Sequence, residues 1–442
     1  MNPITLSKRG EKASETVMRV DLNLYFEAIE NIYHEHDNPN GGFPLNVAEN
    51  KLSWAMLKAK LESISRTQPI PDWVAGYTST LGLPPFRKAL AHFLSKFLTK
   101  CPIDPDKMGI SPGATGVIEV TAFILGDAGD VAVFPAPCYP VYKNDIGSIS
   151  GLERYDLITH HELADLQNGL LLDIPHLEKA LADLQKAGKC FKMLVLTHPD
   201  NPTGGIYETA QLEKIADWCI SKEIHLVVNE IYGLSLINTH HPEIANDYAK
   251  RIDFQSFAQL MELKKSPYLH YWYALSKDFG ISGFRVGLVY SHNETFIKAY
   301  QNINLGHTIS NHTQWLLQML MEDDDFMDDY IRRNQRALTE SYVVVVRYLK
   351  NLKLPYVPSY GSLFVWLDLS EFLESNTPEA EVAFWTAFYR GTGILLTPGA
   401  GFGHTKQGQF RMVFPYISKS DLKVAMERFS AFVKAKRYAS QI

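Results

Sequence analysis

The stretch Ala274–Gly287 reads ALSKDFGISGFRVG, and it decides the fold that we predict. It overlaps the end of the apolar run Tyr271–Leu275, which is typical of a buried strand. Lys277 therefore follows a strand end, where ligands bind in open α/β sheets. A partly desolvated lysine amine can attack a carbonyl group there, and Arg285 could clamp a phosphate. Taken alone, Lys277 would be an ordinary surface lysine, so its interpretation depends on other segments.

Short apolar runs alternate with amphipathic helical patterns between about residues 85 and 300. The near-continuous apolarity of these runs indicates a parallel sheet covered by helices on both faces. The predicted fold class is therefore α/β, with a large domain built on a mainly parallel sheet. The candidate strands are Val131–Phe134, Met193–Thr197, Ile224–Val228, Tyr271–Leu275 and Val286–Tyr290.

The chain changes character after about residue 310, where a helical segment leads to the strand-like run Phe364–Leu367. The run Gln409–Phe414 alternates, so Phe410, Met412 and Phe414 share one face and Arg411 and Val413 the other. A last helix is expected near Ser418, where Ser418 and Asp421 fit a capping box, with Leu422, Ala425, Met426 and Phe429 as its buried stripe. This part is typical of a smaller α+β domain. We expect an N-terminal arm and part of the small domain in residues 1–60, the large domain in 61–305 and the small domain in 306–442.

Composition limits the class of protein. The 442 residues carry 43 Lys and Arg against 49 Asp and Glu, a net charge of −6, which argues against a nucleic-acid partner that needs a basic surface. The four cysteines form no CxxC pair, which argues against a zinc ribbon or a thioredoxin-type site. Four free thiols fit a reducing cytosol, so we expect a cytoplasmic location. No long apolar run predicts a membrane span. The segment His34–Asp37 resembles a set of metal ligands, but we interpret it as a solvated loop and expect no metal. Residues 322–325 with Asp328 and Asp329 form an acidic cluster, which we interpret as a solvated helix face.

Three further segments have chemistry-bearing residues at a helix start or a strand end. Ser111–Gly116 opens an apolar helix with small residues, whose backbone N–H groups can bind an anion. His198–Gly204 places Asn201 before a proline, in extended or turn geometry. Asn229–Tyr232 follows another predicted strand. Each signal is weak alone, but together with Lys277 they predict one ligand site at one edge of the sheet.

This set resembles the pyridoxal-phosphate (PLP) enzymes of fold type I, the aspartate aminotransferase fold, in the class I/II aminotransferase branch. The resemblance covers roughly residues 40 to 430 and rests on HPDNPTGG (198–205), ALSKDFGISGFRVG (274–287) and QFRMVF (409–414), in this order. It implies pyridoxal 5′-phosphate as cofactor, an amino acid and a 2-oxo acid as substrates, and a homodimer with shared active sites.

The resemblance also implies a role for each site residue. Lys277 is expected to form the internal aldimine and to move the proton. Arg411 is expected to clamp the substrate α-carboxylate, a bidentate task that suits a planar guanidinium, with Ala48 and Asn201 as further substrate contacts. The expected phosphate contacts are Arg285, Ser276, Ala114 and Thr115, with Tyr77 from the neighbouring subunit. The expected ring contacts are Tyr139, which stacks on the ring, Asn229 at the ring nitrogen, and Asn201 and Tyr232 at the phenolic oxygen.

One subgroup of the family is closer, the plant-type aminocyclopropane-carboxylate synthases and their relatives. The similar segments are Asn46–Asn50, Leu81–Arg87, Ser276–Gly287 and residues 313–317. Glu49 then matches a catalytic glutamate near the substrate. The subgroup includes lyases, transaminases and proteins of unsettled activity, so membership does not fix the reaction.

The sequence departs from the family at Asn229, where relatives have an aspartate that keeps the pyridine nitrogen protonated. A neutral hydrogen bond in place of a charged one forfeits about 1–2 kcal/mol. The enzyme then tolerates weaker carbanion stabilisation, or Asn229 is an introduced substitution, or the protein is a slow transaminase or an inactive binder. Ala274 replaces a phosphate-contacting serine, and no arginine lies in 302–314, which disfavours dicarboxylate substrates.

We expect an aminotransferase that moves an amino group between an amino acid and a 2-oxo acid through Lys277. The alternative is a lyase or cyclase acting on an amino acid side chain, which begins with the same chemistry at Lys277. A non-catalytic or regulatory PLP-binding protein is a further alternative. We expect no nucleic-acid or membrane partner.

Overall fold

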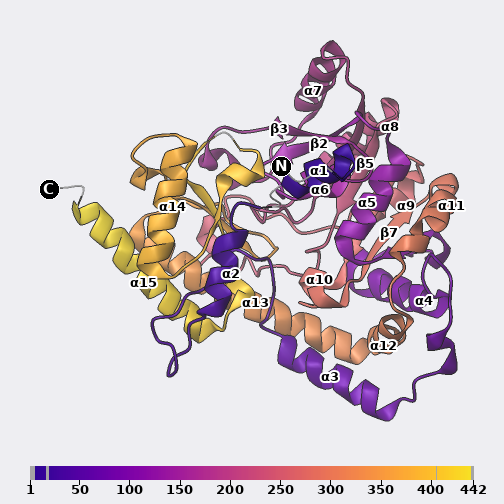
Figure 1. Ribbon diagram of the computed structural model, residues 1–442, viewed down its shortest axis with the longest axis horizontal. Helices are drawn as coiled ribbons and strands as arrows, with labels where there is room; N and C mark the ends of the chain where they lie inside the picture. Colours follow the sequence, from indigo (N-terminus) through magenta and orange to yellow (C-terminus); the bar gives the residue numbers. More distant parts are fainter. Residues whose placement is uncertain (1–4, 16–18, 405, 440–442) are drawn as a thin grey trace.

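Two β-sheets of unequal size organise the chain in the computed structural model, which describes residues 5–15, 19–404 and 406–439 (Figure 1). The larger sheet has seven strands and the smaller has three. The strands of the larger sheet, in spatial order, are β1 (Met108–Ser111), β7 (Gly287–Ser291), β6 (Leu269–Ala274), β5 (His225–Asn229), β4 (Phe191–Thr197), β2 (Val131–Ala136) and β3 (Glu153–Ile158). From β3 to β6 neighbouring strands are parallel, whereas β7 is antiparallel to both β6 and β1.

The α/β fold class is confirmed, and all five predicted strands are present with ends shifted by at most two residues. The sheet is mainly parallel, as predicted, and β7 is the strand that runs against its neighbours. Between β6 and β7 lie only the short helical segments α10 (Leu275–Asp278) and η6 (Ser282–Phe284), which do not carry the chain back along the sheet as a crossover helix would. The strands β1 and β3 were not predicted, because β1 is short and β3 (ERYDLI) alternates charged and apolar residues.

Helices cover both faces of the larger sheet. One face packs against α5 (Gly113–Leu125), α6 (Tyr142–Gly147) and α11 (Glu294–Ile303), and the opposite face packs against α7 (Ile174–Lys186), α8 (Thr209–Ser221) and α9 (Ala258–Lys264). Successive strand residues point to opposite faces, so Val131 and Val133 belong to one buried cluster and Ala132 and Phe134 to the other. The sheet is therefore apolar on both sides, as the sequence predicts.

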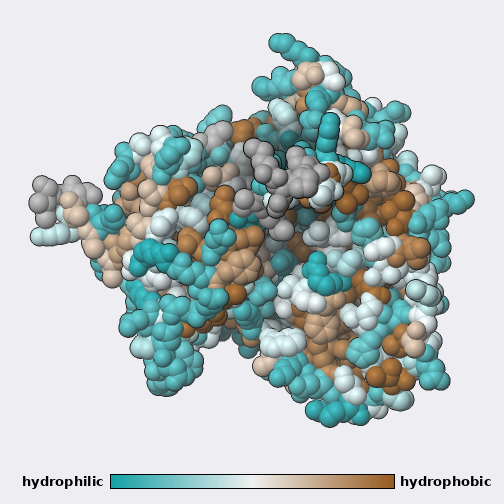
Figure 2. Space-filling view, in the orientation of Figure 1, coloured by the Kyte–Doolittle hydropathy of each residue, from teal (hydrophilic) through white to brown (hydrophobic). Residues whose placement is uncertain are grey.

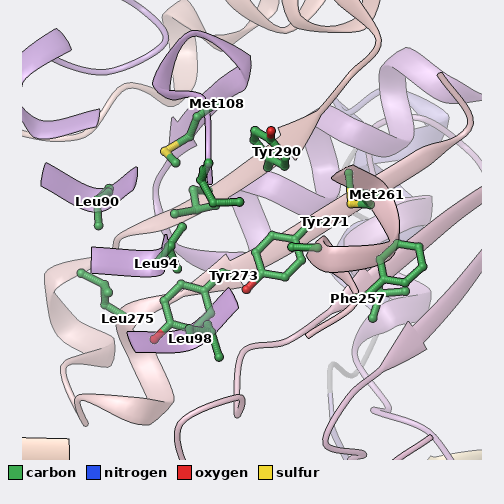
Figure 3. Close-up of a cluster of buried hydrophobic side chains, with 14 of the residues drawn as sticks. Leu90, Leu94, Leu98, Met108, Phe257, Met261, Tyr271, Tyr273, Leu275 and Tyr290 are labelled. Atoms are coloured by element: carbon green, nitrogen blue, oxygen red, sulfur yellow. The ribbon is translucent and has the colours of Figure 1, made fainter. Parts of the chain in front are cut away.

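The second of these faces is also covered by α4 (Pro84–Phe93), the π-helical segment η2 (Leu94–Thr99) and α12 (Asn311–Met321). Figure 3 shows Leu90, Leu94 and Leu98 from α4 and η2 approaching the aromatic rings of Tyr271 and Tyr273 on β6. This packing fixes the strand that leads directly to Lys277.

The smaller sheet has the order β8 (Phe364–Asp368), β10 (Gln409–Val413) and β9 (Thr397–Pro398), all antiparallel. It lies with α14 (Pro378–Thr392), α15 (Lys419–Ala439) and the N-terminal α2 (Leu22–Glu30) on the left of Figure 1, and the long α13 (Asp324–Leu352) packs against α15. The remaining α-helices are α1 (Lys8–Glu15) and α3 (Trp54–Thr67). The remaining 3-10 segments are η1 (Asp72–Ala75), η3 (Pro105–Lys107), η4 (Leu163–Asn168), η5 (Ala245–Asp247), η7 (Asn304–His307), η8 (Ser370–Phe372), η9 (Gly399–Phe402) and η10 (Phe414–Tyr416).

The predicted C-terminal elements are found with one correction. Phe414 does not extend β10 but begins η10, because a proline follows it and interrupts the strand. The last helix begins where expected, since the Ser418 hydroxyl accepts a hydrogen bond from the Asp421 backbone N–H at 3.1 Å. The predicted stripe of Leu422, Ala425, Met426 and Phe429 is buried. The proposed division at residues 60 and 305 stays a prediction.

The acidic residues near 322–329 are helix-face and capping residues, as the sequence predicts. Asp323 caps α13 by accepting from the Phe326 N–H at 3.0 Å, and Asp329 pairs with Arg333 at 2.8 Å. Within residues 5–15, 19–404 and 406–439, no three His, Cys, Asp or Glu side chains lie where they could share a metal ion. In the same ranges, no helix combines the length and apolarity needed to cross a bilayer.

A buried hydrogen bond joins the sheet to α5 and gives a stability prediction. The Trp272 indole N–H donates to the Thr121 hydroxyl at 3.1 Å, and both side chains are buried. Thr121→Val leaves this N–H without an acceptor, so we expect a loss of about 1–3 kcal/mol in the free energy of unfolding. Thr121→Ser keeps the hydroxyl and is the matched control, with a smaller loss. Urea unfolding followed by tryptophan fluorescence measures both, and equal losses would contradict a role for the hydrogen bond.

Candidate active site

Five predicted site residues lie at one edge of the larger sheet. The parallel strands β2, β4, β5 and β6 all end at this edge, where Tyr139, Asn201 and Lys277 follow β2, β4 and β6, and Asn229 is the last residue of β5. Because β7 runs in the opposite direction, it begins at this edge, and Arg285 lies just before it. The convergence predicted from the sequence is therefore present.

Lys277 lies in the short helix α10 and not directly at the strand end, because β6 stops at Ala274. Its Nζ donates to the Ala48 carbonyl at 2.7 Å. Burial lowers the pKa of Lys277 to about 8, with Glu49 opposing this shift and Arg411 adding to it. A lysine with this pKa has an appreciable neutral fraction near neutral pH and can act as a nucleophile.

An anion-binding corner forms where β1 leads into α5. Gly113 at the N-terminus of α5 has φ +76°, and a Cβ there would lie 2.5 Å from the Arg285 Nη2. The Arg285 guanidinium donates to the carbonyls of Ser282 at 3.0 Å and Pro112 at 3.2 Å, and among the described residues no carboxylate pairs with it. The helix N-terminus and the guanidinium together favour a phosphate. Of the other predicted phosphate contacts on these two segments, Ser276 is buried, Ala114 is half-buried and Thr115 is exposed.

The side chain of Asn229 is held in a hydrogen-bonded chain at the end of β5. Its Oδ1 accepts from the Ile231 backbone N–H at 3.2 Å, and its Nδ2 donates to the Tyr142 hydroxyl at 3.0 Å. The Tyr142 hydroxyl lies 3.0 Å from the Thr197 Oγ1. The ring of Tyr139 meets the ring of Tyr142 edge-on, with centroids 5.3 Å apart. Tyr142 was not predicted from the sequence. Its position three residues after Tyr139 was the available signal, because the Tyr142 backbone N–H donates to the Tyr139 carbonyl at 3.3 Å in the turn before α6.

Arg411 on β10 is a buried cation without a described carboxylate partner. Its guanidinium donates to the Asn201 Oδ1 at 2.9 Å and to the Asn46 carbonyl at 2.8 Å, with Thr397 Oγ1 at 3.3 Å. Its Nε has no hydrogen-bond partner among the described residues. Burial lowers the pKa of Arg411 to about 10, with Arg19 as a further cause, so the group is protonated at neutral pH. A buried, uncompensated guanidinium is suited to bind a carboxylate.

Arg19 is a second arginine near this cation, and sequence reasoning missed it. It forms an ion pair with the buried Asp21, and its Nη2 lies 3.3 Å from the same Asn46 carbonyl that Arg411 contacts. The Asn46 side chain donates in turn to Asp21 at 2.6 Å. Arg19 lies in an N-terminal segment without a clear periodic pattern, so the sequence gave no direct sign of its role. The motif Asn46–Asn50, whose first residue it contacts, was the available signal for this part of the site.

The other predicted residues are placed as follows. Tyr232 is buried, and its ring packs edge-on against Phe364 with centroids 5.3 Å apart. Glu49 accepts from the Ser282 hydroxyl at 3.3 Å. Tyr77 is fully exposed and takes no part in the hydrogen bonds and ring contacts described for this site. The individual roles of these residues stay predictions.

The residues at this edge fit pyridoxal phosphate. The corner at Gly113 and Arg285 suits its phosphate, since a side chain at Gly113 would fill the space beside the guanidinium. The low pKa of Lys277 suits its aldehyde. The unpartnered Nε of Arg411 leaves a donor for a substrate carboxylate.

Comparison with known proteins agrees with this geometry. The model of the family "Aminotransferase class I and II" matches residues 44–429. The 1-aminocyclopropane-1-carboxylate synthase 7 of Arabidopsis thaliana is 29% identical over 417 residues, which cover 92% of this chain and 90% of that protein. The 1-aminocyclopropane-1-carboxylate synthase CMA101 of Cucurbita maxima is 31% identical over 419 residues, which cover 93% and 86%. The crystal structure of an archaeal alanine:glyoxylate aminotransferase has the same fold, with a TM-score of 0.79, 17% identity and 98% of each chain covered.

The family model spans most of the chain, and the residues that it spans include all strands of both sheets. The lysine, the anion-binding corner and the buried arginine all lie within the matched range. The chain therefore belongs to the class I and II aminotransferases, a family of pyridoxal-phosphate-dependent enzymes.

Proposed function

We propose that this enzyme transfers an amino group between an amino acid and a 2-oxo acid, with Lys277 as the amine that holds the cofactor and moves the proton. The observation that carries the proposal is the combination of a half-buried lysine of lowered pKa with a buried arginine that has no carboxylate partner among the described residues. The lysine can take up and release a proton near neutral pH, and the arginine can orient an amino acid by its carboxylate.

Each side chain has a distinct task in this proposal. Arg411 and Asn201 bind the α-carboxylate, and the Asn46 carbonyl and the Thr397 hydroxyl hold the guanidinium in place. The Ala48 carbonyl holds the Lys277 amine at 2.7 Å until it is needed. When bound, pyridoxal phosphate supplies the conjugated ring over which negative charge from the substrate spreads. The ring of Tyr139 packs against Tyr142 and that of Tyr232 against Phe364, which limits the access of water to these side chains.

A lyase or cyclase acting on an amino acid side chain is the second candidate. The names of the two plant relatives support it. In this chain the supporting feature is Glu49, whose charge acts on Lys277 and which accepts a hydrogen bond from Ser282. A carboxylate so close to the amine gives the site a second proton acceptor, which a simple transfer reaction does not need.

A homodimer with shared active sites is part of the proposal. Tyr77 is fully exposed, so in this chain it has no ligand or packing partner to explain an aromatic side chain. Trp54, Ile70, Trp73 and Leu305 are also exposed by more than a third. Figure 2 shows hydrophobic residues interspersed with hydrophilic ones on the lower right of this face, in the region of α3 and α12. Such a mixed surface suits an interface between two copies of the chain.

We extend the proposal to a cytoplasmic location and a role in amino acid biosynthesis. The four cysteines are free thiols, and two of them, Cys138 and Cys219, are buried. Free thiols persist in a reducing compartment, which supports the location.

The charge of Glu49 gives a pH prediction. Glu49 raises the pKa of Lys277, so Glu49→Gln should lower it below its value of about 8. A lysine is nucleophilic only when neutral, hence capture of pyridoxal phosphate by the apoenzyme should speed up as pH rises through about 8 and then level off. In Glu49→Gln the midpoint should move to lower pH. Stopped-flow absorbance measures the rates, with the exposed Glu379→Gln as control. A midpoint that stays in place would contradict the electrostatic role.

The reaction type is tested with a panel of amino acids. When holoenzyme is mixed with each amino acid, the correct substrate should yield pyridoxamine phosphate, which chromatography detects. The same mixture should release little ammonia. Lys277→Ala should abolish product by at least several orders of magnitude, because both the amine and its proton transfer are lost. Formation of ammonia or a cyclised product without pyridoxamine phosphate would contradict amino transfer and support the lyase.

The dimer is tested by mixing two inactive variants. Tyr77→Ala and Lys277→Ala homodimers should each be nearly inactive, yet a mixed dimer should regain up to about a quarter to a half of wild-type activity per dimer, because one of its two sites receives both intact residues. Tyr438→Ala, an exposed tyrosine on α15, is the control and should stay active. A monomer in sedimentation at working concentration, or no recovery on mixing, would contradict shared sites.

A further inference from the structure

The hydrogen bonds of Asn229 define which of its two polar atoms faces each neighbour. Its Oδ1 receives the Ile231 backbone N–H at 3.2 Å. A backbone N–H can only donate, so the atom opposite it must be the carboxamide oxygen. The NH₂ group is thereby directed to the other side, where it donates to the Tyr142 hydroxyl at 3.0 Å.

The same polarity continues along the chain of hydrogen bonds. Since the Tyr142 hydroxyl accepts from Asn229, its own proton is free to go to the Thr197 Oγ1, 3.0 Å away. Burial raises the pKa of Tyr142, so the phenol keeps this proton. Asn229 is 5% exposed, and turning its carboxamide over would set an N–H against the Ile231 N–H. The direction of the network is therefore fixed from its backbone end.

A carboxamide nitrogen has two N–H donors, and the network uses one of them. No described residue accepts the second. A carboxylate at this position would offer only acceptors, which would suit a protonated pyridine nitrogen. Asn229 offers the opposite: a protonated ring nitrogen would meet another donor, whereas a bare ring nitrogen would be an acceptor for the free N–H.

From this polarity we infer that Asn229 donates a hydrogen bond to the ring nitrogen of pyridoxal phosphate, and that the enzyme holds its cofactor with an unprotonated ring nitrogen. The inference rests on the proposed function, because it needs the cofactor at this edge of the sheet. An unprotonated ring withdraws less electron density, so it stabilises less of the negative charge that develops at the substrate α-carbon.

The charged groups around the network do not reverse this polarity. Asp145, one helical turn after Tyr142 on α6, is the acidic side chain that acts on Tyr142 and Tyr139. Burial raises its pKa to about 7, with Glu119 adding to the shift and Arg285 opposing it. Asp145 is thus only partly ionised at neutral pH. The other group acting on Tyr142, the Cys138 thiol, has a pKa raised by burial and is neutral.

The test is a ¹⁵N solid-state NMR spectrum of the holoenzyme reconstituted with pyridoxal phosphate labelled at the ring nitrogen. Protonation moves this resonance far upfield, and hydrogen bonding moves it only slightly. We expect the wild-type signal in the unprotonated range at pH 7, and the Asn229→Asp signal in the protonated range, because the new carboxylate can accept from a pyridinium N–H. Free cofactor above and below its own ring-nitrogen pKa gives the reference positions.

Two further variants separate the sources of the effect. Tyr142→Phe removes the hydroxyl acceptor but keeps the Ile231 N–H, so the wild-type ring signal should stay unprotonated. Asp145→Asn should leave it unchanged as well. As a second readout, exchange of the substrate α-proton with solvent should be roughly 5–30-fold faster in Asn229→Asp than in wild type, the equivalent of 1–2 kcal/mol at 1.36 kcal/mol per tenfold.

The outcomes separate this inference from the proposed function. A protein that binds the cofactor at Lys277, shown by borohydride reduction and mass spectrometry, but has a protonated ring nitrogen overturns this inference alone. A ring nitrogen that is protonated in wild type and unprotonated only in Asp145→Asn would assign the ring charge to Asp145. That result would also overturn this inference. A protein that does not attach the cofactor at all overturns the proposed function, and this inference falls with it.

Discussion

The close approach of β7 to the N-terminus of α5 is the constraint on which the site depends. Because β7 runs antiparallel to β6, the chain stays at the carboxyl edge between these two strands, and Arg285 lies there just before β7. A Cβ at Gly287 would lie 2.5 Å from the Gly113 carbonyl, and one at Gly113 would lie equally close to the Arg285 guanidinium. Only glycine leaves room for the backbone and the guanidinium together. The same short turn carries Lys277, so the Lys277 amine and the Arg285 guanidinium are held by one segment of 11 residues, 275–285.

The electrostatic character of the site follows from how few of its cations are paired. Arg411 is buried and Lys277 is half-buried, and desolvation lowers the pKa of both. Of the nearby cations, Arg19 alone has a buried carboxylate partner, in Asp21. Burying unpaired cations costs folding free energy, which the chain recovers when anionic groups bind. A phosphate and a carboxylate are the two anions that a PLP enzyme brings to this position. The arrangement of the site thus favours anion binding and lowers the free energy of unfolding of the protein without bound anions.

The sequence predicted well those features that depend on local pattern. Continuous apolar runs located β2, β4, β5, β6 and β7 and the buried stripe of α15, because burial on two faces leaves an unambiguous pattern. Motifs at the ends of these runs pointed to Lys277 and Asn229, and the alternating run 409–414 pointed to Arg411. Contacts between distant segments could not be predicted in the same way. Arg19, Asn46 and Arg411 meet at one carbonyl oxygen, yet each lies in a different part of the chain and none has a pattern that names the others. The direction of β7 could not be predicted for a related reason, because an apolar run indicates that a strand is buried but not how it is oriented.

The two arginines that share the Asn46 carbonyl, Arg19 and Arg411, both act electrostatically on Lys277. Arg411 lowers the pKa of Lys277, and so does Arg19, which touches the same oxygen. A carboxylate that neutralises Arg411 removes part of this repulsion and raises the proton affinity of Lys277. By thermodynamic reciprocity, a proton on Lys277 strengthens the binding of the carboxylate by the same factor. A carboxylate bound at Arg411 would therefore favour proton uptake by Lys277 without any movement of the backbone.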